Sequence, residues 1–201
     1  MENVLQYFKI GESDGGSQDW FTDFWMKRGG CAALTAVDSC LYLTREKQLT
    51  GLCPVDAYAL TEESYVQFGM IMKPYISPRP MGVHKLEMYT EGFEQYLRER
   101  NCSAVEMERY PMGTPTAEAA ERIRGQIDAG LPVPMLHLRP KTPRVDDYEW
   151  HWFLLIGCRD ADSGLEVRTV TYGVCEWVPL QDLWHETDAA NGGLILYRLQ
   201  A

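Results

Sequence analysis

The chain has 201 residues, 45% of them hydrophobic and 24% charged, which excludes a disordered or fibrous protein and suits one folded domain over residues 1–201. Its formal net charge of -10 repels nucleic acid and anionic membrane surfaces, so we expect neither as a partner. No window reaches the roughly 18 apolar residues of a membrane span, and no basic stretch near the N-terminus leads into an apolar run. We therefore expect a cytoplasmic protein.

The first part of the chain is predicted to be helical. After a Gly-rich loop over residues 11–17, aromatic residues recur at near-helical spacing over residues 18–26, and residues 27–30 are expected to end that segment. Residues 31–43 are small and apolar and contain neither Gly nor Pro. This composition predicts a helix that is buried on most sides.

The middle section, residues 52–100, is expected to be mostly helical. Thr61, followed by two glutamates, is a plausible helix start, and residues 86–100 form a second amphipathic stretch. Between them, three prolines within residues 74–80 predict an extended surface loop, because proline fixes φ and restrains the residue before it. That loop is in a position to border a cleft.

The second half is predicted to be rich in strands. A strand over residues 104–110 precedes a helix that Thr114 and Pro115 are expected to cap and that Gly130 ends. Further runs of apolar and β-branched residues predict strands at 133–138, 150–158, 165–172, 174–178 and 194–199. Helices followed by strands indicate an α+β fold.

Six cysteines are spread along the chain without a close C-x-x-C pair, so each is expected to be reduced and most are expected to be core residues. Cys31 differs because it follows Gly29 and Gly30 directly and begins the predicted helix. Helix amides and the helix dipole stabilise a thiolate there, and the glycines let another backbone or a substrate come close. The alternative interpretation is a Gly-Gly turn followed by a buried cysteine.

His151 is a polar residue at the start of an otherwise apolar predicted strand. A neutral imidazole is the usual partner that activates a thiol, by taking its proton or by pairing with the thiolate. The alternative is a histidine that is satisfied by hydrogen bonds near the surface.

The order of these features is more informative than either residue alone. It runs from Gly-Gly-Cys at a helix start through a helical middle section to residues 123–133 (IRGQIDAGLPV), the His151 strand and residues 171–173 (TYG). This order resembles the papain-like cysteine peptidases over about residues 29–184, and among them the bacterial double-glycine-leader peptidases that process bacteriocins. The resemblance implies a central helix, begun by Cys31, packed on a C-terminal antiparallel β-sheet.

The resemblance also implies roles for individual residues. Cys31 would be the nucleophile, His151 the general base and Gln18 the oxyanion-hole side chain, although Gln18 lies 31 − 18 = 13 residues before Cys31, farther than usual. Residues 170–173 carry no Asp or Asn to orient the imidazole, so the hydroxyl of Thr171 or a backbone carbonyl is expected there. Asp160 is a fallback orienter, but residues 160–164 are more typical of a polar hairpin turn.

The leading hypothesis is a thiol hydrolase, a peptidase or amidase, that uses a Cys31–His151 dyad on a peptide or small amide substrate without a metal or cofactor. A transferase or deamidase with the same dyad is equally compatible. The alternative is a catalytically inactive papain-like binding module, which the missing Asp or Asn favours. A third interpretation treats Cys31 as a redox sensor.

Overall fold

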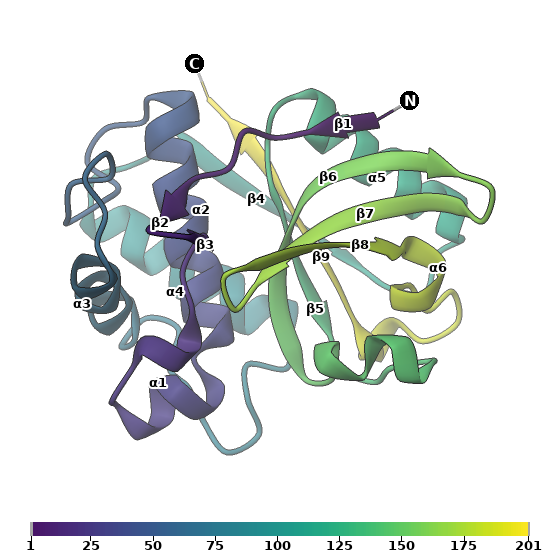
Figure 1. Cartoon of the computed structure of the whole chain (residues 1–201), viewed down its shortest axis with the longest axis horizontal. Helices are drawn as coiled ribbons and strands as arrows, with labels where there is room; N and C mark the ends of the chain where they lie inside the picture. Colours follow the sequence, from purple (N-terminus) through teal and green to yellow (C-terminus); the bar gives the residue numbers. More distant parts are fainter. Residues whose placement is uncertain (1, 201) are drawn as a thin grey trace.

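A computed structural model describes residues 2–200 as a helical part that packs against a β-sheet (Figure 1). The helices are α1 (Phe24–Gly29), α2 (Cys31–Lys47), α3 (Glu62–Met72), α4 (Leu86–Glu99), α5 (Thr116–Asp128) and α6 (Leu180–Leu183), with 3-10 turns η1 (Gln18–Trp20), η2 (Pro143–Tyr148) and η3 (Ala189–Asn191). The strands are β1 (Glu2–Val4), β2 (Lys9–Ile10), β3 (Ser13–Asp14), β4 (Val105–Pro111), β5 (Val133–His137), β6 (His151–Ala161), β7 (Gly164–Thr171), β8 (Val174–Pro179) and β9 (Gly192–Leu199). The expected α+β class is confirmed.

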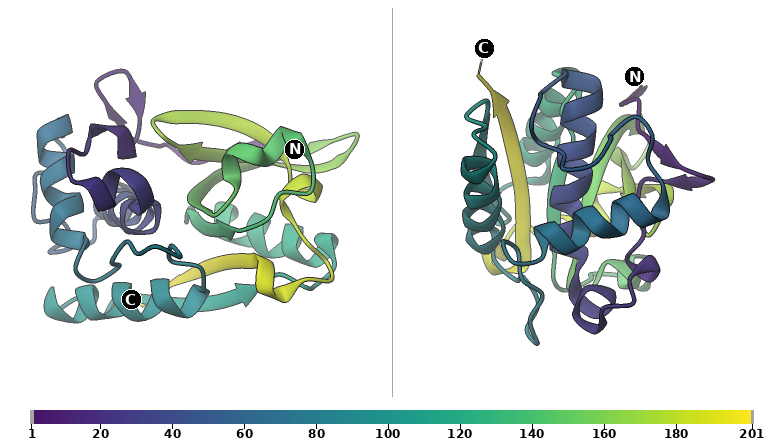
Figure 2. Two further views of the ribbon diagram at one scale, coloured as in Figure 1. Left: turned by 90° about the horizontal axis from the view of Figure 1, so that it is seen from below. Right: turned by 90° about the vertical axis from the view of Figure 1, so that its left-hand side faces the viewer.

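Helix α2 is the centre of the helical part. Every residue from Ala32 to Leu43 is buried, because the small side chains on this helix let neighbouring elements approach from all sides. It contacts α3, α4 and the sheet strand β6, and Figure 2 shows α3 on its outer side. Helix α3 starts at Thr61 as predicted, with a reciprocal capping box between Thr61 and Ser64.

The sheet has the order β4-β9-β5-β6-β7-β8, and β1 pairs with β6 beyond the end of β5. All of its described pairings are antiparallel. Residues 151–158 of β6 are buried without alternation, because α2 and α5 both pack on this strand. The strand that begins at His151 is therefore the middle of the fold.

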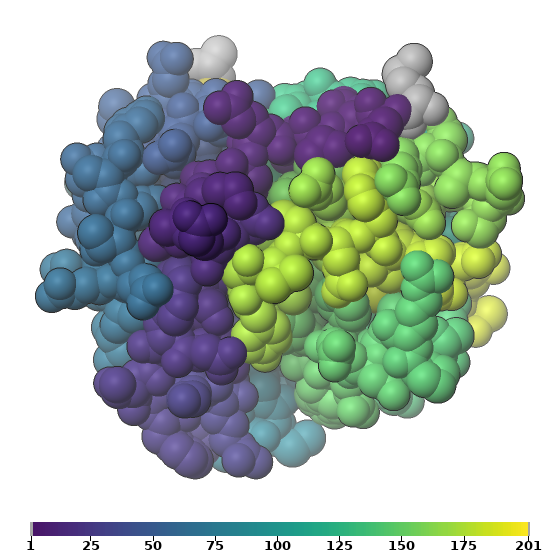
Figure 3. Space-filling model, in the orientation of Figure 1, coloured from purple at the N-terminus to yellow at the C-terminus, as the bar shows by residue number. Residues whose placement is uncertain are grey.

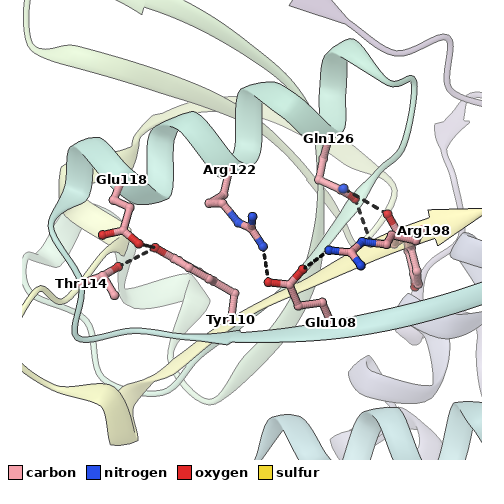
Figure 4. Close-up of polar contacts among 8 residues, drawn as sticks. Glu108, Tyr110, Thr114, Glu118, Arg122, Gln126 and Arg198 are labelled. Atoms are coloured by element: carbon pink, nitrogen blue, oxygen red, sulfur yellow. Dashed lines mark hydrogen bonds and ion pairs between the residues drawn. The ribbon is translucent and has the colours of Figure 1, made fainter.

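Helix α5 is tied to the sheet by polar contacts (Figure 4). Gln126 exchanges two hydrogen bonds with the backbone of Tyr197, at 2.8 and 3.1 Å, and Tyr110 donates its phenolic hydrogen bond to Glu118 at 2.9 Å. The prediction that Thr114 helps to cap this helix is wrong. Its hydroxyl pairs with that of Tyr110, and the helix begins after Pro115 without a side-chain cap.

Two other local predictions need correction. The aromatic segment is not one helix, because Asp23 accepts hydrogen bonds from two backbone amides and starts α1, which then continues through Gly29; only Gly30 interrupts it before α2. The polar hairpin turn is narrower than expected. Asp160 belongs to β6, and residues 162–163 connect it to β7.

Candidate active site

Cys31 is the first residue of α2, and Gly30 is the junction between α1 and α2. The Gly30 amide donates a hydrogen bond to the Met26 carbonyl at 3.0 Å, and a Cβ on Gly30 would lie 2.5 Å from that oxygen. No larger residue fits there without a backbone shift. Glycine thus allows the chain to turn tightly and present the half-buried Cys31 at the first turn of a long helix.

His151 is the first residue of β6 and is 5% exposed. Its Nε2 lies 2.7 Å from the hydroxyl oxygen of Thr171, at the end of the neighbouring strand β7. Its ring stacks on that of Tyr172, with centroids 5.1 Å apart and planes 6° from parallel. One face and one edge of the imidazole are therefore held in place.

Tyr172 reaches the imidazole because of the turn between β7 and β8. Thr171 pairs with Val174, which leaves Tyr172 and Gly173 as a two-residue loop with φ values of 50° and 77°. Positive φ at both positions defines a type I′ hairpin turn, which glycine tolerates easily and tyrosine does not. The Gly173 carbonyl also accepts a hydrogen bond from Asp14 at 2.9 Å. Figure 3 shows the N-terminal segment against this hairpin at the surface.

The fold brings Cys31 and His151 to one cavity. The amide of Trp152, the residue after His151, is among the backbone groups that act to lower the pKa of the Cys31 thiol. Both residues line a cavity of about 340 Å³, together with Gln18 and Tyr172. Residues 79–83, the end of the predicted Pro-rich segment and the three residues after it, form another part of its wall.

Burial dominates the electrostatics of the two groups. It raises the pKa of the Cys31 thiol above its ordinary value, and hydrogen bonds from the backbone amides of Trp152, Ala32 and Cys31 itself oppose this only in part. Burial, with a smaller contribution from His137, lowers the pKa of His151 to about 4. Burial of Cys31 thus opposes the thiolate that the helix start is expected to stabilise. A neutral thiol faces a cavity shared with a neutral imidazole at pH 7.

Gln18 belongs to η1 and is 7% exposed. Its Nε2 donates a hydrogen bond to the Lys27 carbonyl at 2.8 Å, and its Oε1 is buried without a hydrogen-bond partner among residues 2–200. An amide nitrogen carries two hydrogens, so one donor remains after the bond to Lys27. Gln18 thus lines the same cavity as Cys31, but one of its two amide hydrogens is already hydrogen-bonded to α1.

Asp160 lies at the opposite end of β6 from His151 and forms an ion pair with Arg124 of α5. It is therefore not positioned to orient the imidazole. The partner at His151 Nε2 is the Thr171 hydroxyl.

A buried carboxyl lies behind Cys31 on α2, and we did not expect it from the sequence. A narrow cavity of about 20 Å³, also bordered by Cys31, His151 and Thr171, includes Asp38 and Tyr65 in its lining. The Asp38 carboxylate accepts hydrogen bonds from Tyr7 at 2.9 Å and from Tyr65 at 2.8 Å. Burial raises its pKa to about 7, although both tyrosines oppose the shift. An aspartate in a helix with otherwise small or apolar neighbours was the available signal.

Residues 2–200 bring together no group of three or more His, Cys, Asp or Glu side chains that could hold a metal ion. None of the helices in this range combines the length and the apolar character that crossing a bilayer requires.

Comparisons with known proteins found no matching family model, no matching curated protein and no matching solved structure.

Proposed function

We propose that this chain is a papain-like thiol hydrolase that cleaves a peptide or amide bond, with Cys31 as the nucleophile and His151 as the general base. One observation carries the proposal. The thiol at the start of α2 and the imidazole at the start of β6 border one cavity. A nucleophile and a base that border one cavity at the junction of two structural parts are typical of acyl chemistry.

The proposed reaction has two steps. The Cys31 proton passes to the imidazole while sulfur bonds to the substrate carbonyl carbon, and collapse of the tetrahedral adduct breaks the C–N bond as the imidazolium protonates the leaving amine. Water then gives one proton to His151 and attacks the thioester, which releases a carboxylic acid and restores the thiol. Backbone amides in the first turn of α2 and the remaining N–H of Gln18, which lines the same cavity as Cys31, are the candidate donors for the oxyanion.

Thr171 supports the role of His151 as a base. When Nε2 carries the ring proton, it donates to the Thr171 hydroxyl, and Nδ1 keeps the lone pair that accepts the thiol proton. The low pKa of His151 keeps this lone pair available at neutral pH. A hydroxyl stabilises the imidazolium less than a carboxylate does, so we expect slow turnover.

The same observations favour a second candidate, an inactive papain-like binding module. The raised pKa of Cys31 and the hydroxyl partner of His151 would both suit a protein that kept the cavity and lost the chemistry. The two candidates differ in one measurable property, which is whether His151 increases the reactivity of Cys31.

The test is alkylation by iodoacetamide, followed for each cysteine by mass spectrometry between pH 5 and pH 10, approximately the range in which thiols and imidazoles titrate. A buried thiol without a base should react more slowly at pH 7 than an ordinary one, because its pKa is raised. If His151 takes the proton, Cys31 should react at least about tenfold faster than the other five cysteines, and His151→Ala should remove that advantage.

The matched control is His185→Ala, which removes a half-buried histidine that lines neither cavity beside Cys31. It should leave the rate at Cys31 unchanged, and circular dichroism should show that both variants fold. If the alkylation rate at Cys31 is unchanged in His151→Ala, or equals the rate at the other thiols, the hydrolase proposal is overturned and the binding module is favoured.

A further inference from the structure

A second and larger cavity begins on the other side of Trp150. Its volume is about 570 Å³, and we call it the distal cavity. Trp150 and Leu138 line both the distal cavity and the cavity at Cys31, so the two spaces are neighbours that share a wall. The start of α4, the end of β4 and the segment that leads from η3 into β9 supply the remaining walls.

The lining of the distal cavity is mainly apolar. The side chains that give it this character come from six separate elements or connecting segments and are Leu86, Pro111, Leu136, Leu138, Trp150, Ala189 and Ala190. Of its three charged residues, Arg139 pairs with Asp188 at 2.9 Å, Glu87 pairs with Arg109 at 3.6 Å, and the side chain of Lys85 is exposed. Because apolar side chains predominate in the walls, the cavity favours a ligand group that buries hydrocarbon.

Trp150 is held as the divider between the two cavities. Its φ of 51° is in the left-handed region, which is unfavourable for a bulky residue. Its amide donates a hydrogen bond to the Leu138 carbonyl at 3.2 Å, and its ring lies 6.2 Å from that of His84. The indole is nevertheless 46% exposed. An exposed aromatic ring held in a strained conformation between two cavities is suited to contact a ligand that passes it.

We propose that the distal cavity binds an apolar arm of the substrate whose scissile carbonyl lies at Cys31. The inference rests on the proposed function and names the substrate class: a peptide or amide with a hydrocarbon group that reaches past Trp150. The arm is either an alkyl chain or an apolar amino-acid side chain, and both have the same chemistry toward these walls. A cavity of this size is within the range of roughly 300–1,000 Å³ that ligand sites occupy.

The test uses iodoacetamides that carry N-linked tails, because they report on Cys31 without a known substrate. One series carries linear alkyl tails of increasing length, and a second carries leucine amide or phenylalanine amide. The measured quantity is the tail gain, the rate constant at Cys31 for the tailed reagent divided by that for plain iodoacetamide. Each buried methylene is worth roughly a fourfold change, so a tail that enters the distal cavity should give a gain of at least about tenfold.

Ala190→Trp places a large side chain in the wall of the distal cavity and should reduce the tail gain to nearly one. Ala117→Trp is the matched control, because Ala117 is exposed on α5 and lines neither cavity. This variant should keep the full tail gain, which would rule out nonspecific hydrophobic binding of the tails. A gain in the alkyl series alone identifies a linear chain as the arm, and a gain with the amino-acid tails identifies a peptide side chain.

Two results would overturn this inference: no tail raises the rate at Cys31, or the gain is the same in Ala190→Trp and Ala117→Trp. Failure of the proposed function has a different signature. In that case plain iodoacetamide already reacts at Cys31 no faster than at other cysteines, whatever the tails do.

Discussion

Replacing Asp38 with asparagine should change how the stability of the protein depends on pH. Burial raises the pKa of this carboxyl to about 7 in the folded chain, whereas an unfolded aspartate has a pKa of about 3.9. The folded state therefore holds a proton that the unfolded state releases between about pH 4 and pH 7, and stability is lost as the pH rises through this range. Three pKa units correspond to about 4 kcal/mol, or roughly 1.4 kcal/mol for each pH unit.

Asparagine has nearly the same shape but does not titrate. The free energy of unfolding of Asp38→Asn, minus that of the wild type, should therefore rise by about 4 kcal/mol between pH 4 and pH 8, against a typical total of about 5–15 kcal/mol. His137 and His151, whose pKa values burial lowers to about 4, destabilise the fold as the pH falls below about 6.5. Because both proteins retain them, their contributions cancel in the difference.

The assay is urea denaturation of both proteins at half-unit pH intervals, with the free energy extrapolated to zero denaturant. A difference that stays constant within about 1 kcal/mol across the range would refute the reasoning. It would show that Asp38 is ionised in the fold and that the two tyrosine hydroxyls compensate its burial.

Three further substitutions test the neighbourhood of the site. Thr171→Val should slow alkylation of Cys31 about two- to tenfold, the value of one lost hydrogen bond, while Thr171→Ser should keep the wild-type rate. Equal rates in the two variants would show that the Thr171 hydroxyl does not contribute to the reactivity of Cys31. Gly30→Ala should lower the free energy of unfolding by about 1–3 kcal/mol in urea titrations because its methyl group meets the Met26 carbonyl, and an unchanged midpoint would contradict this packing. Tyr172→Asn should suit the type I′ turn and uncover the imidazole, so NMR titration should show the pKa of His151 rising from about 4 toward its ordinary value; no rise would mean that the tyrosine ring does not shield it.

The main helix and the strands were predictable because each corresponds to a long run of residues of one character, small and apolar for the helix and apolar for the strands. Cys31 begins a helix whose interior side chains are small and buried, and His151 begins a strand that is apolar for most of its length. The position of Thr171 beside the imidazole was expected from the resemblance, and the structure places its hydroxyl 2.7 Å from Nε2. The apolar pattern of such a helix or strand can be recognised in the sequence because burial of the whole element determines it.

The remaining features depend on contacts between distant parts of the chain. The short strand β1 has too few residues to show a period, and its partner on β6 is far away in sequence. The helix start that lowers the pKa of Cys31 is visible in the sequence, whereas the burial that raises it is not. The stacking of Tyr172 on His151 follows from a turn geometry that a Tyr-Gly pair signals only weakly.

The pairing of β1 with β6 has a consequence for synthesis of the chain. Glu2 pairs with Arg159, which lies 159 − 2 = 157 residues later in the sequence, so residues 2–4 must wait for a partner strand that is synthesised much later. The contact between His151 and Thr171 of the next strand forms later still. Until then α2 lacks the strand that covers it, and the cavity at Cys31 lacks the wall to which His151 contributes. Such late, non-local closure slows folding and exposes apolar surface to chaperones. Under the proposed function, reactivity of Cys31 that depends on His151 would therefore appear only after the chain has been synthesised through β7.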